Sequence, residues 1–233
     1  MSRHNQYIKA ALQSAVLARR QYLRGRMLDI GCGDKPYEAA LRPYVAEHIG
    51  LDHPDSLHGL AHADIVASAY EIPVGDRHFD SMLATEVLEH LEEPLAALTE
   101  WARAMAPGGT LVLTTPTIWH LHDEPRDFYR YTPHGVEYLL RRAGFEVVEI
   151  STIGGFWSTF GQLLAYVFMT YDRGWVHRLH IVGPLSVLAQ RTGARLERSS
   201  HRRRWASHVV AVGRRPQEPL VGEDGVPGTI LRP

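Results

Sequence analysis

The stretch that decides the fold is Met27-Leu28-Asp29-Ile30-Gly31-Cys32-Gly33-Asp34-Lys35-Pro36. An apolar run enters a turn with two glycines, which predicts a strand, a tight loop and then a helix. Glycine lets the backbone come close to a ligand at the carboxyl end of a parallel strand. The dinucleotide pattern Gly-x-Gly-x-x-Gly fails, because its third glycine would fall on Pro36. Asp29 precedes the first glycine by two residues, and its charge favours a cationic ligand over a pyrophosphate.

Outward from this turn, short apolar runs alternate with helical stretches. The predicted strands are Arg26–Ile30, His48–Leu51, Phe79–Ala84, Thr110–Thr114, Glu146–Ile150 and His208–Val212. The predicted helices are Tyr37–Val45, Glu86–Met105 and Pro133–Ala143, and Pro107-Gly108-Gly109 predicts a turn before the fourth of these strands. Such alternation predicts an α/β fold, in which a doubly wound parallel sheet carries helices on both faces.

Composition limits the class of protein. The chain has 233 residues, a length that suits one large domain. Its 25 basic and 26 acidic side chains lack the positive excess of a nucleic-acid binder. Its single cysteine, Cys32, excludes an internal disulfide framework and a cysteine-rich zinc site. The charges are unevenly spread, because residues 191–215 hold eight arginines and one acid, Glu197. This region is therefore built differently from the acidic body.

The two ends differ from the central domain. Residues 1–24 have helical apolar spacing without the continuous apolar core of a secretory signal, so we expect a helix packed on the domain and a cytoplasmic protein. Residues 25–215 form the expected domain. Residues 216–233 are rich in proline and glycine, and we expect a flexible tail.

Five segments, in order, resemble motifs of the class I S-adenosylmethionine-dependent methyltransferases, in particular the methyltransferase type 11-like family. They are Asp29-Ile30-Gly31-Cys32-Gly33, Gly50-Leu51-Asp52, Ile72 to Asp80, Glu86-Val87-Leu88-Glu89-His90-Leu91 and Pro107-Gly108-Gly109-Thr110-Leu111. The resemblance implies a Rossmann-like, seven-stranded, mostly parallel sheet whose last strand is antiparallel and follows an insertion. It also implies S-adenosyl-L-methionine as the cofactor.

The resemblance carries cofactor-binding roles onto ten residues: Asp29, Gly31, Cys32, Gly33, Asp52, Ser68, Ala69, Ala84, Thr85 and Glu86. Asp52 stands 23 residues after Asp29, where a ribose diol would be held. One departure concerns the adenine contact, because Ser68 stands where the family usually has an acid. A serine hydroxyl accepts the same hydrogen bond more weakly, and Asp64 falls four residues earlier, beside or within the third strand.

The tract Thr115–Pro133 follows the fifth strand of the implied sheet and is dense in aromatic and titratable residues. It resembles a loop of a subset of methyltransferases that act in polysaccharide and natural-product assembly. The predicted catalytic residues are His120, His122 and Asp123 as general bases and Tyr129 and Tyr131 as the lining of the transfer site. Alternatively, Asp127, Arg130 and Tyr131 form a structural hydrogen-bond cluster.

No metal is expected from the sequence, because His-x-Glu and His-Glu-x-x-His patterns are absent. Glu89 and His90 are interpreted as residues that orient the start of a helix.

Residues 153–205 are a long insertion before the last strand. Ile150–Tyr171 is 22 residues without a formal charge, long enough to span a membrane. A span would separate the last strand from its own sheet, so the predictions left are a lid, a homodimer surface or a peripheral membrane contact. Arg202, Arg203 and Arg204 add charge that suits an anionic surface, although a solvated basic flank explains them equally well.

These observations predict an O-directed methyltransferase for a small-molecule, natural-product or glycan-type acceptor, without nucleic acid as partner. The two alternatives are a non-catalytic module with the same fold and a nucleotide-cofactor oxidoreductase. The break at Pro36 disfavours the oxidoreductase, and the intact glycine turn with both acids disfavours the non-catalytic module.

Overall fold

The computed structural model describes residues 5–172, 180–197 and 205–217. Its strands are β1 (Arg26–Ile30), β2 (Glu47–Asp52), β3 (Ile65–Val66), β4 (Phe79–Thr85), β5 (Met105–Pro116), β6 (Glu146–Ile153) and β7 (His208–Arg214). Its α-helices are α1 (Gln6–Leu17), α2 (Glu38–Leu41), α3 (Pro94–Ala104), α4 (Pro133–Arg142), α5 (Phe156–Thr170) and α7 (Val182–Glu197), and two short 3-10 helices are η2 (Arg20–Tyr22) and η3 (Leu88–His90).

All seven strands form one sheet in the order β3-β2-β1-β4-β5-β7-β6. The pairs from β3 to β5 are parallel, and β7 runs antiparallel to both β5 and β6. This confirms the expected Rossmann-like architecture with its antiparallel last strand.

The core alternates along the strands because successive side chains point to opposite faces of a sheet. Met27 packs on the face that carries α1 and α2, together with Val16 and Leu41. Leu28 packs on the other face, in the larger cluster that contains Trp101 of α3 and Leu140 of α4. Helices therefore cover both faces, and the strand ends remain free to form a site.

Two predicted helices are shorter than the sequence indicated. The predicted helix Tyr37–Val45 is reduced to α2, because Pro43 has no amide hydrogen to continue the ladder. The predicted helix Glu86–Met105 contains only η3 and then α3, whose first residue is Pro94. Proline favours the first position of a helix and breaks an interior, so the long helix was a wrong prediction.

The predicted turn at Pro107-Gly108-Gly109 falls inside a strand instead of before one. These residues belong to β5, which is continuous from Met105 to Pro116. The Gly108 amide donates to the Arg215 carbonyl at 2.9 Å, and the Arg215 amide donates to the Gly109 carbonyl at 2.9 Å. Gly108 nevertheless has φ +75°, and the register of β4 with β5 shifts between Phe79 and Ser81, so these residues form an irregular, bulged start of β5.

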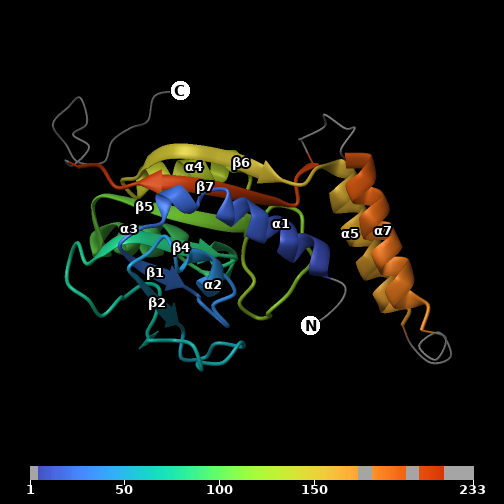
Figure 1. Cartoon of the computed structure of the whole chain (residues 1–233), viewed down its shortest axis with the longest axis horizontal. Helices are drawn as coiled ribbons and strands as arrows, with labels where there is room; N and C mark the ends of the chain where they lie inside the picture. Colours follow the sequence, from blue (N-terminus) through green and yellow to red (C-terminus); the bar gives the residue numbers. More distant parts are fainter. Residues whose placement is uncertain (1–4, 173–179, 198–204, 218–233) are drawn as a thin grey trace.

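The insertion folds as a helical hairpin made of α5 and α7, which stand side by side away from the sheet (Figure 1). Among the described helices, none is long and apolar enough to cross a membrane. Arg202, Arg203, Arg204 and the tail from residue 218 lie outside the described residues.

Candidate active site

A cavity of about 190 Å³ opens where β1, β2, β3 and β4 end. The strand order reverses direction beside β1, and such a switch point is where open α/β sheets bind ligands. The lining residues are Ile30, Gly31, Leu51, Asp52, His53, Asp55, Ser56, Leu57, His58, Ala67, Ser68, Ala69, Tyr70, Glu86, Val87, His90, Leu91, Glu92, Asp123 and Arg126.

The glycine turn shapes the floor of this cavity. Gly31 has φ +64°, and a Cβ there would lie 2.5 Å from Cγ2 of Val87, so both the conformation and the space require glycine. Asp52 is buried in the adjacent wall. Its Oδ2 accepts a hydrogen bond from the Gly33 amide at 2.9 Å, and its Oδ1 accepts one from the His53 amide at 2.8 Å. Both amides hold the carboxylate in one orientation beside the cavity.

Asp29 and Cys32 lie behind the turn rather than in the cavity wall. Asp29 is fully buried, 2.8 Å from Nε2 of His48, and burial raises the pKa of Asp29. Burial also raises the pKa of the Cys32 thiol to about 12, which keeps it protonated. The acid of the motif therefore supports the strand end from within the protein.

The opposite wall is formed by Ser68, Ala69 and Tyr70. The Ser68 hydroxyl accepts a hydrogen bond from the Tyr70 amide at 3.2 Å, and the Ala69 carbonyl accepts one from Nε1 of the buried Trp101 at 3.0 Å. Asp64 does not line the cavity; its Oδ2 accepts hydrogen bonds from Nζ of Lys35 at 2.5 Å and from the Gly50 amide at 2.8 Å. Ser68 is thus better placed than Asp64 to meet a ligand.

Glu86 follows β4 with φ +55°, an unusual conformation for a residue other than glycine. Its Oε1 accepts a hydrogen bond from the Thr114 hydroxyl at 2.7 Å, and its Oε2 lies 3.0 Å from Nε2 of the buried His208. These contacts fix Glu86 at the edge of the cavity, next to Ala84 and Thr85 at the end of β4.

The loop after β5 is held by Asp127, whose side chain is only 1% exposed. Its carboxylate accepts two hydrogen bonds from the Arg130 guanidinium, at 2.6 and 2.8 Å, and one from the His122 amide at 2.9 Å. Arg130 holds the pKa of Asp127 well below its usual range. The Tyr131 hydroxyl donates to the Leu88 carbonyl at 3.2 Å. Asp127 and Arg130 therefore pair as the structural alternative predicts, whereas Tyr131 bonds to η3 instead.

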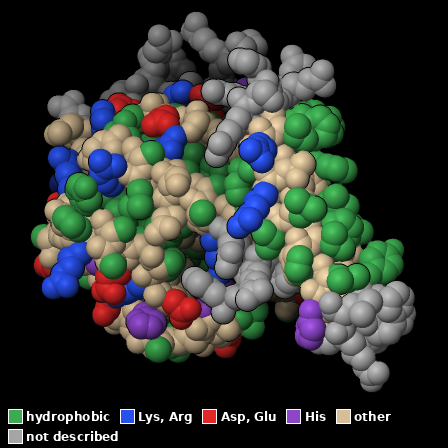
Figure 2. All heavy atoms as spheres, turned by 45° about the vertical axis from the view of Figure 1, so that its right-hand side comes forward, with side chains coloured by type: hydrophobic (Ala, Val, Ile, Leu, Met, Phe, Trp, Pro, Cys, Tyr) green, Lys and Arg blue, Asp and Glu red, His purple; other side chains and the backbone are tan. Residues whose placement is uncertain are grey.

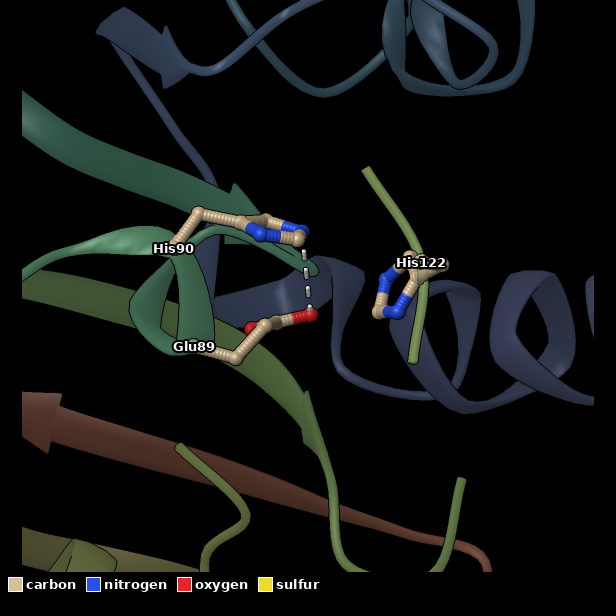
Figure 3. Close-up of side chains that lie close together, drawn as sticks. All are labelled: Glu89, His90 and His122. Atoms are coloured by element: carbon tan, nitrogen blue, oxygen red, sulfur yellow. Dashed lines mark ion pairs between the residues drawn. The ribbon is translucent and has the colours of Figure 1, made fainter. Parts of the chain in front are cut away.

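Three imidazole rings gather where this loop meets η3. The rings of His90 and His122 are 4.9 Å apart, and those of His120 and His122 are 6.0 Å apart. Burial lowers the pKa of both His90 and His120. Glu89 and His90 lie opposite His122, as Figure 3 shows, and Nε2 of His90 is 3.8 Å from Oε1 of Glu89.

The family comparison agrees with this geometry. Residues 2–150 match a family described as a methyltransferase domain. The chain belongs to the class I S-adenosylmethionine-dependent methyltransferases. Its cofactor is accordingly S-adenosylmethionine.

Relatives of this methyltransferase include a ubiquinone biosynthesis O-methyltransferase of Cereibacter sphaeroides, 32% identical over 50% of this chain and 49% of the relative. The O-methyltransferase cnsE of Penicillium expansum is 27% identical, with 54% of each chain covered. The methyltransferase thus spans about half the length of these curated relatives. Among solved structures, the cyclase SpnF shares the fold with a TM-score of 0.61 and 23% identity, over 90% of this chain and 82% of the other.

Of the ten residues that the resemblance assigns to the cofactor, five line the cavity and five do not. Gly31, Asp52, Ser68, Ala69 and Glu86 line the cavity of the methyltransferase. The remaining five support that wall from behind or beside it: Asp29, Cys32, Gly33, Ala84 and Thr85.

The predicted catalytic residues are also divided. Asp123 lines the cavity, whereas His120 and His122 lie in the imidazole group beside it. The Tyr129 hydroxyl donates to the Glu92 carbonyl at 2.9 Å, so both tyrosines bind backbone. Sequence reasoning did not assign His53, His58, Tyr70, His90 or Arg126 to the site, and only the proximity of His90 to Glu86 in the fourth motif could have indicated one of them.

Proposed function

We propose that this methyltransferase transfers the methyl group to a hydroxyl oxygen of a small-molecule, natural-product or glycan-type acceptor. The observation that carries the proposal is the imidazole group of the loop after β5, which adjoins the cavity through His90 and Asp123. Hydroxyl acceptors, unlike thiolates or carbanions, gain from a neighbouring group that removes a proton. The matched relatives from Cereibacter and Penicillium are O-methyltransferases, which supports the same acceptor atom.

The residues that line the cavity fit the cofactor. The oriented Asp52 carboxylate suits a ribose diol, the close backbone approach at Gly31 suits the amino-acid part, and Ser68 with Ala69 suits the adenine ring. Glu86 adds negative charge at the rim, which favours a cationic ligand. When bound, the sulfonium supplies an electrophilic methyl group and a good leaving group.

The chain itself orients the acceptor and handles its proton. Asp127 holds the backbone of His122, and its Oδ2 lies 3.4 Å from Nδ1 of the same residue. A ring held in this way presents Nε2 to the space beside His90. His120 packs on Tyr166 with ring centroids 4.1 Å apart, so α5 holds this ring beside the other two imidazoles. Alignment and exclusion of water supply most of the rate enhancement in such a transfer.

The test uses methyl-labelled S-adenosylmethionine and a panel of phenolic, catecholic and sugar hydroxyl acceptors. The expected product carries one labelled methyl ether by mass spectrometry, and His120→Ala and His122→Ala lower turnover while binding of S-adenosylhomocysteine persists in calorimetry. A label found on nitrogen or carbon, or full turnover in both variants, contradicts the proposal.

A further inference from the structure

We propose that Glu89, His90 and His122 form a binding site for a divalent transition-metal ion on the acceptor side of the cavity. Each residue offers one ligand atom, and these three atoms lie within 4.8 Å of one another (Figure 3). Ligands opposite each other on one ion are about 4.2 Å apart, given bonds of about 2.1 Å. Small side-chain rotations would therefore bring all three ligand atoms within bonding distance of one ion.

The hydrogen bonds behind the two rings point their free nitrogens toward this space. Nδ1 of His90 lies 2.5 Å from the Arg126 carbonyl, which can only accept, so Nδ1 carries the hydrogen and Nε2 keeps its lone pair. Nδ1 of His122 lies 3.4 Å from Oδ2 of Asp127. Metal-bound histidines almost always donate their second ring nitrogen to a carbonyl or carboxylate in this way.

Glu89 supplies the independent observation. Its side chain is fully buried, and its Oε2 accepts a hydrogen bond from the Thr115 hydroxyl at 3.0 Å. Its Oε1 has no hydrogen-bond partner and faces Nε2 of His90 at 3.8 Å. A buried carboxylate oxygen without a hydrogen-bond partner costs free energy, and an ion between it and Nε2 of His90 would give both atoms a ligand bond. A metal ion satisfies both.

Two imidazoles and one carboxylate suit a first-row transition metal such as Co²⁺, Fe²⁺ or Zn²⁺, and leave open coordination positions. His90 lies in the cavity wall, so these positions face the acceptor. We infer that they take two neighbouring oxygens of the acceptor, as in a catechol or a vicinal diol. This role rests on the proposed O-methyl transfer, because a metal lowers the pKa of a hydroxyl that it binds. With the ion bound, the His122 lone pair is on the metal, so His120 is left as the ring that can take the proton.

Titration of the metal-free full chain with Co²⁺ tests the site without cofactor or acceptor, with the cobalt absorption bands and calorimetry as readouts. One Co²⁺ is expected per chain. Glu89→Gln and His122→Ala are expected to weaken its affinity at least tenfold, and melting of the metal-free variants checks their folding.

Matched controls are Glu86→Gln and His120→Ala, which change the neighbouring carboxylate and imidazole outside the set, and both should keep the cobalt affinity. The site is overturned if the wild-type chain does not bind cobalt, or if Glu89→Gln and His122→Ala bind cobalt as tightly as wild type. Since this titration involves no methyl transfer, its failure leaves the proposed function standing. The acceptor role fails if metal removal leaves turnover of a catechol unchanged.

A second, independent observation concerns the α5–α7 hairpin. Large apolar side chains remain exposed along both of its helices, and Figure 2 shows hydrophobic side chains gathered on this part of the surface. The most exposed are Phe160 (50%), Val167 (48%), Tyr171 (69%) and Leu188 (60%). The two helices meet through small residues instead, with a Cβ built on Gly161 only 3.3 Å from Cα of Gly193. The large side chains are thus left for another surface.

Charge identifies that surface. Among the described residues of the hairpin, Arg191 and Arg195 are exposed, whereas the acids Asp172 and Glu197 are half-buried. Glu197 also accepts hydrogen bonds from the amides of Trp157 and Ser158 at 2.8 and 3.1 Å. Exposed apolar and cationic side chains together suit an anionic lipid surface. A second copy of the chain would bring like charges together. We therefore infer that the hairpin lies in the interface of an anionic bilayer.

Co-sedimentation of the full chain with vesicles tests this inference. Binding is expected to vesicles that contain phosphatidylglycerol, and to fall at least fivefold with pure phosphatidylcholine. The double variant Phe160→Ser, Leu188→Ser should lose binding, whereas Val148→Ser, which changes an exposed apolar residue of β6, should not. A stable dimer that the double variant dissociates, with no vesicle binding, overturns the inference in favour of self-association.

Discussion

At the scale of single residues, Asp127 fixes the conformation of the loop after β5. Its buried carboxylate meets the Arg130 guanidinium through two hydrogen bonds and also holds the His122 amide. Removing one partner of a buried ion pair is costly, because the other charge stays without compensation. We expect Asp127→Ala to lower the free energy of unfolding by about 3 kcal/mol, as measured by urea denaturation.

Folding lowers the pKa of Asp127, so its contribution to stability is complete above the unfolded pKa of about 3.9. The contribution is lost as the pH falls toward the folded value, and the difference between wild type and Asp127→Ala should shrink below about pH 4. The control is Asp123→Asn, because the Asp123 side chain is 39% exposed and asparagine also tolerates its φ of +51°. It should change stability by less than about 0.5 kcal/mol. An equal loss in both variants contradicts the argument.

Asp52 is the residue that we propose orients the cofactor. Asp52→Asn removes the charge and turns an amide donor toward the Gly33 or His53 amide, so the orientation of the group is lost as well. We expect the Kd for S-adenosylhomocysteine to rise about tenfold or more in calorimetry, since hydrogen bonds to charged groups contribute about 1.5–3 kcal/mol. Asp55→Asn changes a carboxylate that is 76% exposed on the same rim and should leave the Kd nearly unchanged.

Sequence could predict these residues only where local spacing determines position. Asp52 and Gly31 follow directly from the ends of two neighbouring strands, and both line the cavity. The group formed by Glu89, His90 and His122 could not be predicted, because His122 reaches the other two only through the fold of its loop. Asp29, which the resemblance places beside the cofactor, does not line the cavity and lies 2.8 Å from His48, a partner that no local spacing indicates.

At the scale of elements, the hairpin depends on two glycines that let its helices touch. A Cβ on Gly193 would lie 2.3 Å from the Trp157 carbonyl oxygen, and one on Gly161 would lie 2.6 Å from that of Ala189. Backbone cannot move aside as a side chain can. We expect Gly193→Ala to destabilise the hairpin by about 1–3 kcal/mol, seen as faster amide hydrogen exchange over Phe156–Thr170.

Gly183 provides the matched control in the same helix, because a Cβ there meets nothing within 4 Å. Gly183→Ala should leave exchange unchanged or slow it, since alanine favours a helix by up to about 1 kcal/mol over glycine. If both variants exchange alike, close helix contact does not explain the glycines.

The elements also show which patterns carry predictive information. Strands were predicted well because their apolar runs are buried on both faces of a parallel sheet. Helix bounds were predicted poorly where Pro43 and Pro94 cut apparently continuous patterns. The hairpin was recognised only as an apolar and basic insertion, because its outward side chains do not follow the rule that apolar residues are buried.

At the scale of the whole molecule, the methyltransferase has two parts with different construction. None of the residues in the three described apolar core clusters belongs to α5 or α7. The two parts meet at the loop after β5, where Tyr166 of α5 packs on His120. The Tyr166 hydroxyl also donates to Oδ1 of Asn5, before α1, at 2.5 Å. A hairpin that binds a surface is thus connected to the loop that we propose handles the acceptor.

The two ends of the hairpin are close enough to be joined directly. Ile153 pairs with His208 across β6 and β7, and the Ser207 amide donates to the Ile153 carbonyl at 3.1 Å. Replacing residues 155–206 with Asn-Gly, a pair that favours tight β-hairpins, should therefore close the sheet without strain. Because the core clusters stay intact, we expect cooperative melting and an unchanged Kd for S-adenosylhomocysteine.

Turnover of the shortened chain should fall and vesicle binding should disappear, since His120 loses Tyr166 and the exposed apolar side chains are gone. An unfolded product, or one that no longer binds the cofactor, would show that the hairpin is part of the domain's own fold.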